Sequence, residues 1–467
     1  MIVTIGDWLA LLKRKFYRLR DWGWVEVNYI KEMAVILDVR KFYQATNPSK
    51  TLDVDKIEDR KYYIDFSSVR GSQIIEELLD KITFFSPDEA TCDLFTGHVG
   101  CGKSTELLRL KKELEKSGFH VVYFESSQDL EMADVDISDI LLAIARQVSQ
   151  SLEEVKISLK PSYFTSLFKE IGGFFQTPIE LSAEAELSFV IGKITAKTKE
   201  APKLRDKLRD YLEPRTSSLL QCIDRELMTP AISKLKQQGK QGLVVIVDNL
   251  DRVDSTQKPS GRPQPEYLFV DRGEQLKQLN CHVVYTIPLG LIFSNDAERL
   301  TERFGTDPKV LPMVPVRLRD GSECVEGMNL LRQMVIARAF PDLDEQQRLA
   351  AISDVFDSPD TLDRLCQVSG GHVRNLLRLL HRWIELEKKI PLSRNRLEDV
   401  IRERRNQLTL RIDPQEWELL RQVAENKQVS GDKNYQILIR SMFVFEYRDR
   451  DGSWFDINPL LADAKEL

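Results

Sequence analysis

The pattern of apolar and polar residues between about residues 60 and 325 predicts strands that alternate with helices. Short apolar runs bounded by turn residues predict strands over 91–96, 120–125, 242–247 and 282–287. Helical spacing of apolar residues predicts helices over 73–82, 104–117 and 140–152, with Ser138 as the cap of the last one. Alternation of this kind is typical of a parallel sheet covered by helices, so we expect an α/β fold.

After about residue 325 the pattern becomes helical. It predicts helices over 329–339, 344–355, 361–368, 373–387 and 394–407, the last of them capped by Ser393. Two shorter helices, 414–424 and 435–441, precede alternating runs at 443–448 and 453–457. The runs flank Asp451-Gly452, a dipeptide that favours a tight β-hairpin. Helices followed by such a hairpin indicate a winged-helix-like domain at the end of the chain.

These patterns divide the chain into four predicted parts. They are an N-terminal helical appendage over 1–45, a core over 46–325, a helical domain over 326–408 and the winged-helix-like domain over 409–467. Residues 155–236 interrupt the alternation and are expected to form a helical insertion in the core. The basic amphipathic start of the chain could lie on a membrane or a partner, but packing on the main domain is the favoured interpretation.

Composition excludes several classes of protein. Hydrophobic residues make up 42% of the 467 and charged residues 30%, so the chain can bury a core and is not expected to be disordered. It has no uncharged apolar run of about 18 residues, and its start is a poor signal peptide, so we expect a cytoplasmic protein without a membrane span. None of its six cysteines forms a Cys-x-x-Cys pair, which argues against disulfides and zinc.

One motif carries specific chemistry. The segment 97–104, GHVGCGKS, fits G-x-x-x-x-G-K-[ST] between a predicted strand and a predicted helix. Backbone N–H groups of such a loop and of the helix start bind phosphate oxygens. Lys103 would reach the β- and γ-phosphates of ATP, and the Ser104 hydroxyl would bind Mg²⁺. The residues assigned to nucleotide binding are Gly97, His98, Val99, Gly100, Cys101, Gly102, Lys103, Ser104 and Thr105.

A second segment, which is acidic, completes the predicted nucleotide site. The apolar strand that ends at Asp248 would deliver this carboxylate to the edge of the sheet, where it could hold Mg²⁺ through water. The next residue is Asn249, where many such ATPases have the glutamate that activates water. Asp251 or Glu125 could act instead, although a loop cap and a surface turn are the structural alternatives for them. Hydrolysis is therefore expected to be slow or to need a partner.

These segments resemble the additional-strand P-loop ATPases, and within them the STAND and AAA+ groups. The resemblance covers about residues 60–385, with a possible winged-helix tail to 467, and the segment 243–252 is most similar to STAND sequences. STAND proteins are nucleotide-switched signalling ATPases, and the AAA+ group includes origin initiators that also end in a winged helix. The resemblance implies that the helical domain 326–408 acts as a lid over the nucleotide.

The same resemblance implies roles for residues outside the two motifs. Thr286 would be a polar sensor of the γ-phosphate, or only a strand-end hydroxyl. Arg374, at the start of the lid helix, would contact the γ-phosphate, or be an ordinary arginine at a helix start. Arg299 and Arg303 could be arginine fingers, although surface ion pairing is favoured. The segment 66–71 loosely resembles the segment that lines the adenine pocket.

Charge favours protein partners over DNA. The net charge is −6, and residues 410–467 hold eleven acidic and eight basic side chains, whereas a phosphate backbone needs Lys and Arg on one face. The basic stretch 388–405 keeps DNA possible. We therefore expect a slowly hydrolysing ATP switch that controls a protein assembly, with a protein partner or self-oligomer and no membrane contact. The alternatives are a nucleotide-dependent DNA-binding regulator and a non-hydrolysing ATP-bound scaffold.

Overall fold

A computed structural model of the chain describes residues 17–18, 24–25, 37–71, 73–159, 164, 166–167, 170, 187–431 and 433–467. It divides into two units, 1–37 and 38–467, and each is described by itself. In the first unit, β1 (Tyr17–Arg18) and β2 (Trp24–Val25) pair as antiparallel strands. Apart from these four residues, the predicted helical appendage lies outside the described residues as far as residue 36. α2 (Val39–Ala45) is a helix of the second unit.

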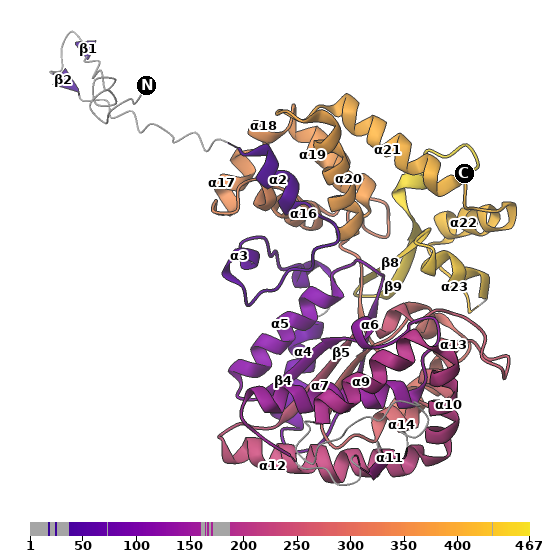
Figure 1. The fold of residues 1–467 in the computed structure, drawn as a ribbon. Helices are drawn as coiled ribbons and strands as arrows, with labels where there is room; N and C mark the ends of the chain where they lie inside the picture. Colours follow the sequence, from indigo (N-terminus) through magenta and orange to yellow (C-terminus); the bar gives the residue numbers. More distant parts are fainter. Residues whose placement is uncertain are drawn as a thin grey trace. The chain divides into compact units, whose positions relative to one another are not determined.

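A five-stranded parallel sheet forms the centre of the second unit (Figure 1). Its strands are β3 (Cys92–Gly97), β4 (His120–Glu125), β5 (Leu243–Asp248), β6 (His282–Thr286) and β7 (Lys309–Leu311). They lie in the order β4-β5-β6-β3-β7, so β6 separates the strand before the glycine-rich loop from the strand that ends at Asp248. The α/β prediction is confirmed. Only β7 was missed, because three residues are too few to establish an alternating pattern.

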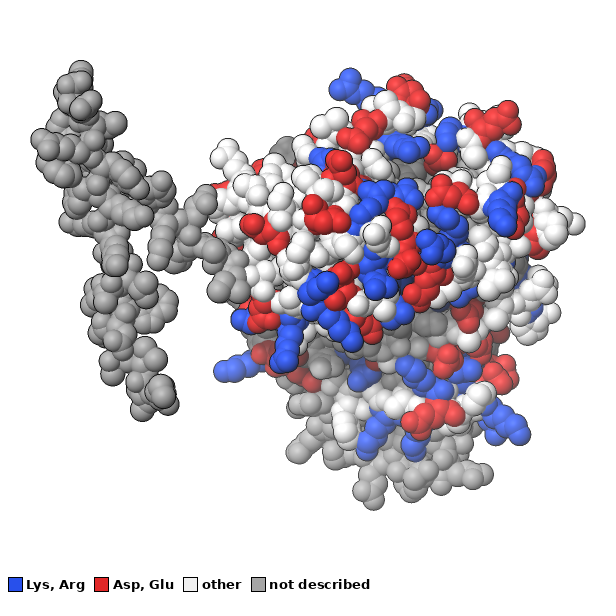
Figure 2. All heavy atoms as spheres, turned by 90° about the horizontal axis from the view of Figure 1, so that it is seen from above, with Lys and Arg blue, Asp and Glu red and all other residues white. Residues whose placement is uncertain are grey.

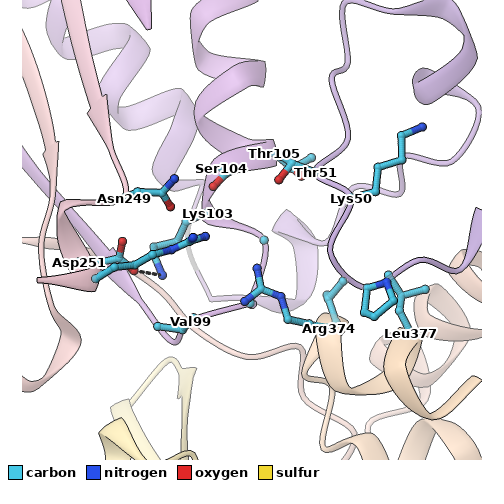
Figure 3. A pocket seen from close by; sticks show the side chains of 15 residues that line it. Lys50, Thr51, Val99, Lys103, Ser104, Thr105, Asn249, Asp251, Arg374 and Leu377 are labelled. Carbon is cyan, nitrogen blue, oxygen red and sulfur yellow. Dashed lines mark ion pairs between the residues drawn. The ribbon is translucent and has the colours of Figure 1, made fainter. Parts of the chain in front are cut away.

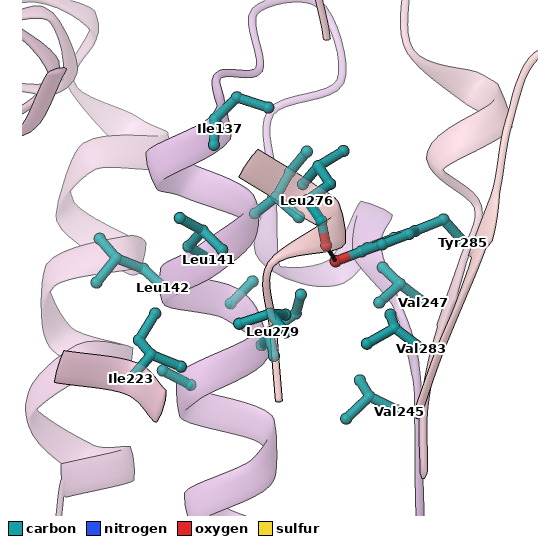
Figure 4. Packing of buried hydrophobic residues seen from close by; sticks show 14 of the residues in the cluster. Ile137, Leu141, Leu142, Ile223, Val245, Val247, Leu276, Leu279, Val283 and Tyr285 are labelled. Atoms are coloured by element: carbon teal, nitrogen blue, oxygen red, sulfur yellow. Dashed lines mark hydrogen bonds between the residues drawn. The ribbon is translucent and has the colours of Figure 1, made fainter. Parts of the chain in front are cut away.

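Both faces of the sheet are buried, as a parallel sheet requires. Successive residues of β5 belong to opposite sides: Val245 and Val247 pack with α7 (Ile137–Glu154), whereas Val244 and Ile246 pack with α4 (Ile74–Asp80) and α5 (Lys103–Lys116). Figure 4 shows the first of these layers, where the Tyr285 hydroxyl also donates a hydrogen bond of 3.1 Å to the Leu276 carbonyl. Burial of each aliphatic side chain contributes about 1.5–3 kcal/mol to the stability of the fold. This packing holds the strand ends in place.

Two predicted helix caps are corrected by the structure. α7 begins at Ile137 because the Asp136 side chain accepts the Ile137 N–H and forms a capping box with Asp139, so Ser138 lies inside the helix. Ser393 does precede α21 (Arg394–Thr409), but its hydroxyl donates to the Glu387 carboxylate at 2.8 Å and makes no cap hydrogen bond. In both places a carboxylate accepts a backbone N–H at the helix start in place of the serine hydroxyl, Asp136 for α7 and Asp357, at 2.7 Å from the Arg394 N–H, for α21.

The insertion between β4 and β5 is helical where the structure describes it. Its helices are α9 (Leu187–Glu200), α10 (Pro202–Leu212), α11 (Thr216–Cys222) and α12 (Thr229–Gln237). Arg209 of α10 bonds to the carboxylates of Asp134 and Asp139 at the start of α7. The positive charge that Arg209 brings to the insertion is therefore neutralised within the fold.

The second half of the unit contains the helices and the hairpin that the pattern predicts. They are α16 (Val325–Ala339), α17 (Glu345–Ala350), α18 (Ile352–Val355), α19 (Pro359–Ser369), α20 (Val373–Glu387), α21, α22 (Pro414–Asn426), α23 (Lys433–Arg440), β8 (Val444–Asp449) and β9 (Gly452–Ile457). β8 and β9 pair antiparallel around Asp451-Gly452. Phe445, Tyr447 and Trp454 of this hairpin join the same buried cluster as α4 and α5, so the end of the chain packs directly on the core.

Candidate functional site

A cavity with about 550 Å³ of empty space, part of it open to solvent, lies between the glycine-rich loop, the start of α20 and the segment 48–51 (Figure 3). Six of the residues assigned to nucleotide binding line it, namely Val99, Gly100, Gly102, Lys103, Ser104 and Thr105. Gly97, His98 and Cys101 do not line it. The structure thus brings most of the predicted loop to one cavity, and the remaining three residues form the far side of the loop.

The loop can adopt its curve because glycine occupies two positions whose backbone conformation would strain any other residue. Gly100 has φ +93° and Gly102 has φ +111°, in the region that favours glycine. A Cβ atom on Gly100 would lie 2.8 Å from Cβ of Arg374, so α20 approaches the loop closely at this point. Gly102 precedes the first turn of α5, whose free N–H groups and positive dipole end favour an anion.

Lys103 is a buried charged group at the centre of the site. Its Nζ donates to the carbonyls of Gly97 and His98 at 2.7 and 2.9 Å, and lies 3.0 Å from Oδ2 of Asp251. Burial opposes the charge on Lys103, but attraction to Asp251 outweighs it and the net pKa is raised. The ammonium therefore stays protonated at neutral pH, and a phosphate would have to replace one of these three acceptors.

Asp248 lies at the sheet edge as predicted, and only 1% of it is exposed. Its Oδ2 accepts a hydrogen bond of 2.8 Å from the Tyr123 hydroxyl, and its Oδ1 accepts one of 2.7 Å from the Asn249 N–H. Burial raises the pKa of Asp248, against hydrogen bonds from the Ser104 and Tyr123 hydroxyls. The sequence analysis missed Tyr123. In the sequence it is marked only by a phenol side chain among the apolar residues of the strand.

Asp251 and Glu125, the two candidates for activation of water, and Thr286, the candidate γ-phosphate sensor, occupy different environments. Asp251 lines the cavity, and its Oδ1 is buried without a hydrogen-bond partner. Glu125 pairs in register with Asp248 but does not line the cavity. Thr286, also outside the lining, accepts a hydrogen bond from Leu250 N–H at 2.9 Å and donates one to Val247 O at 3.3 Å, so it holds the turn after β5. Of the three, the structure brings only Asp251 into the cavity.

Two arginines face the loop from different elements. Arg374 of α20 lines the cavity and donates its backbone N–H to the Gly100 carbonyl at 3.2 Å. Arg252, which the sequence analysis did not select, lines it from the turn after β5. Burial and then repulsion from Arg252 lower the pKa of Arg374. Neither guanidinium forms an ion pair with a described carboxylate, so both are free to bind an anion.

Two histidines hold the glycine-rich loop from behind. His98 Nε2 accepts the Glu446 N–H of β8 at 2.9 Å, and His372 Nε2 lies 2.9 Å from the Val99 carbonyl. Burial lowers the pKa of His98 well below its ordinary value and that of His372 to about 3, so both rings are neutral. The Phe445 ring lies beside both of them, 5.8 Å from His98 and 5.7 Å from His372 between centroids.

Other predicted residues lie outside the cavity. None of residues 66–71 lines it; Arg70 instead supports the loop by donating to the Cys101 carbonyl at 2.7 Å. Pro48, Lys50 and Thr51 occupy that side of the cavity. Arg299 pairs with Asp296 and Asp271, and Arg303 lies 3.9 Å from Glu274, which agrees with the favoured interpretation of surface pairing.

The residues fit a nucleotide with Mg²⁺. Within the described parts of the chain, no group of three His, Cys, Asp or Glu could hold a metal ion by itself. Mg²⁺ commonly takes one or two protein oxygens and completes its shell with phosphate oxygens and waters. Ser104 and Asp248, which share a hydrogen bond, could provide those protein oxygens. The unpartnered Oδ1 of Asp251 offers a further acceptor at the same place.

Comparison with known proteins finds one matching family model and several similar solved structures. Residues 72–258 match the KAP family P-loop domain. Solved structures similar to the chain include the Walker-type ATPase PABY2304 of Pyrococcus abyssi, at 13% identity and TM-score 0.41 over 90% of this chain and 98% of that one. Another is ORC1 of Aeropyrum pernix in complex with DNA, at 13% identity and TM-score 0.34 over 83% of this chain and 92% of that one. A third is Cdc6p of Pyrobaculum aerophilum, at 11% identity and TM-score 0.39 over 90% of this chain and 95% of that one. No curated protein matches. The family match and the strand order identify a P-loop NTPase domain in this chain.

Proposed function

We propose that this chain, which contains a P-loop NTPase domain, binds ATP with Mg²⁺ and uses its slow hydrolysis to switch a protein assembly. The observation that carries the proposal is the meeting of Lys103, Asp251 and Arg374 at one cavity, although they come from three separate elements. A cationic pocket with an exposed helix N-terminus is suited to a triphosphate.

Phosphate and metal binding follow from the loop and from β5. The N–H groups at the start of α5 and the Lys103 ammonium would neutralise the β- and γ-phosphates. Ser104 and Asp248 would hold the metal, and the Tyr123 hydroxyl keeps the Asp248 carboxylate in one orientation. Mg²⁺ would supply charge neutralisation of the triphosphate.

Asp251 is the proposed base for hydrolysis. Its Oδ1 has no hydrogen-bond partner and could accept a proton from water, while Oδ2 is engaged by Lys103 at 3.0 Å. The ammonium occupies one of the two carboxylate oxygens, so a single oxygen is left for water. This pairing supports slow turnover, in keeping with Asn249 at the position where related ATPases have glutamate.

The switch would operate through the contacts of the loop. Arg374 reaches the cavity from the lid helix, and the same helix bonds to the loop through its backbone N–H. Loss of the γ-phosphate would leave Arg374 and Arg252 close together without an anion between them. Their mutual repulsion would favour movement of the lid away from the core.

A protein is the favoured partner. On the face of the molecule seen in Figure 2, basic and acidic side chains are interspersed, which suits protein contacts better than a DNA backbone. The described part of the chain contains no helix with the length and hydropathy that a bilayer crossing requires. A cytoplasmic location remains part of the proposal.

Phosphate release from ATP by the purified protein tests the proposal. We expect slow Mg²⁺-dependent release that falls on the order of a hundredfold in Asp251→Asn and is lost in Lys103→Ala. Release that is unchanged in Lys103→Ala would come from a contaminant and would contradict the proposal. Nucleotide binding without any release would favour the scaffold alternative.

The same protein should be examined by mass photometry with ATP, with ADP and without nucleotide. A mass that depends on the nucleotide supports control of an assembly. A mass that does not change, together with salt-dependent binding to duplex DNA, would favour the DNA-binding regulator instead.

A further inference from the structure

We propose that a second cavity, on the other side of the glycine-rich loop from the nucleotide cavity, binds a small zwitterionic molecule with an apolar side chain, such as an apolar α-amino acid. This cavity has about 650 Å³ of empty space, part of it open to solvent. It lies between the loops at the carboxyl edge of the sheet and α23, and only Val99 and Asp251 line both cavities. The inference goes beyond the proposed nucleotide site.

The wall of this cavity is largely apolar and comes from two parts of the chain. The core contributes Leu289 and Leu291 of η8 (Leu289–Phe293), and the C-terminal part contributes Ile439 and Met442. α23 packs against η8, so the two halves of the wall are in contact beside the cavity. A size of several hundred Å³ with an apolar lining and a few polar groups is typical of small-molecule sites.

One polar group of the lining requires a donor. Glu266 lies at the end of α13 (Gln264–Glu266), and its Oε2 is shielded from solvent without a hydrogen-bond partner. An unsatisfied buried acceptor is unfavourable, because it has lost its water without gaining another donor. The Oδ1 of Asp251 is shielded and unpartnered in the same way. A ligand ammonium group beside the Glu266 carboxylate would lie within an acidic part of the cavity.

The opposite polar group is a cation. Arg440, in the last turn of α23, also lines the cavity, and its guanidinium donates to the Ser255 hydroxyl. No described carboxylate forms an ion pair with it. A guanidinium has five N–H donors and binds a carboxylate in bidentate fashion. A ligand carboxylate would therefore complete the interactions of Arg440.

These groups together define the ligand class. The ammonium and carboxylate of an amino acid match Glu266 and Arg440, and its side chain matches the apolar wall. A simple amine or a simple acid would satisfy only one of the two groups. Since α23 and the core each contribute one charged group, the ligand would also strengthen the contact between them.

The test uses the full-length chain without nucleotide. L-leucine, L-phenylalanine, isoamylamine and 4-methylpentanoate are added in turn, and binding is followed by thermal shift and calorimetry. We expect at least one of the two amino acids to raise the melting temperature and to bind at least about tenfold more tightly than the amine or the acid. Glu266→Gln and Arg440→Gln should each weaken amino-acid binding by about tenfold or more.

Two controls keep the result specific. Glu298→Gln removes an exposed carboxylate of α15 (Ala297–Phe304) outside the cavity and should leave amino-acid binding unchanged. Lys103→Ala should weaken nucleotide binding at least about tenfold but leave amino-acid binding in place, so failure of one proposal can be told from failure of the other. Circular dichroism of each variant shows whether it is folded.

Three results would overturn the inference. They are the absence of binding by all four compounds at millimolar concentration, amino-acid binding that survives both Glu266→Gln and Arg440→Gln, and amine binding as tight as that of the amino acids.

Discussion

The two sides of the glycine-rich loop differ in how they are held. The side that faces the lid meets Arg374 and Arg252, two guanidiniums without a described carboxylate partner. The side that faces the C-terminal hairpin meets Phe445 and Glu446, both 0% exposed. The first side is polar and cationic, whereas the contacts of the loop with the hairpin are buried and hydrogen-bonded. We infer that the lid side binds the nucleotide and that the hairpin contacts maintain the shape of the loop.

The largest effect is expected on the hairpin side. Phe445→Ala removes a ring that is 0% exposed and packs beside His98 and His372. The free energy of unfolding should fall by about 3–5 kcal/mol, since a large cavity is left. Chemical denaturation measures this change. The control Phe84→Ala removes a ring that is 75% exposed and should change stability by less than about 0.5 kcal/mol.

Equal stability of the two phenylalanine variants would contradict the packing of the hairpin on the loop.

The next effect depends on pH. Burial raises the pKa of Glu446 to about 7, from an ordinary value near 4.5. The folded state therefore holds a proton that the unfolded state has lost between these values, and stability should fall as pH rises from about 4.5 to about 7. Glu446→Gln keeps an acceptor for the Ser453 hydroxyl and removes this titration. At pH 8 the variant should be more stable than the wild type by up to about 3 kcal/mol.

Denaturation of both proteins at pH 5 and at pH 8 measures this difference. A gap that is the same at both pH values would show that Glu446 does not titrate in the folded protein.

On the lid side the effect should be smaller and should concern the ligand. Arg374→Gln should weaken ATP binding by about tenfold, because one charge-assisted hydrogen bond is lost, and should change ADP binding much less. The matched control is Arg382→Gln, about two turns further along α20, where the arginine pairs with Glu385 and Glu403. Calorimetry with both nucleotides measures the change.

An equal loss of ATP and ADP affinity in Arg374→Gln would mean that this arginine does not distinguish the γ-phosphate. A loss in Arg382→Gln of the same size would point to a general effect of the lid helix.

Local features were predictable from the sequence because they depend on neighbouring residues. The period of the apolar positions gave four of the five strands of the sheet, and Asp451-Gly452 gave the hairpin turn. The loop motif identified one wall of the cavity, whereas Asp248 at the strand end does not line it. Competition between close neighbours was harder to foresee, as the choice of Asp136 over Ser138 at the start of α7 illustrates.

Contacts between distant segments were not predictable. His98 and Glu446 are 348 positions apart, and no local pattern indicates that the hairpin packs behind the loop. The same holds for Tyr123 beside Asp248 and for Pro48 at the cavity wall. These contacts depend on which faces of the elements meet, and that is decided by packing of the whole unit rather than by residue type.

Calorimetric titration of Mg²⁺ and ATP into the wild type and Lys103→Ala is the most direct test of the central claim, that this cavity is a nucleotide site. We predict one ATP bound per wild-type chain, with affinity that falls at least about tenfold in the variant, because the buried ammonium beside Asp251 is lost. Equal affinity in the two proteins, or no ATP bound by the wild type, would contradict it.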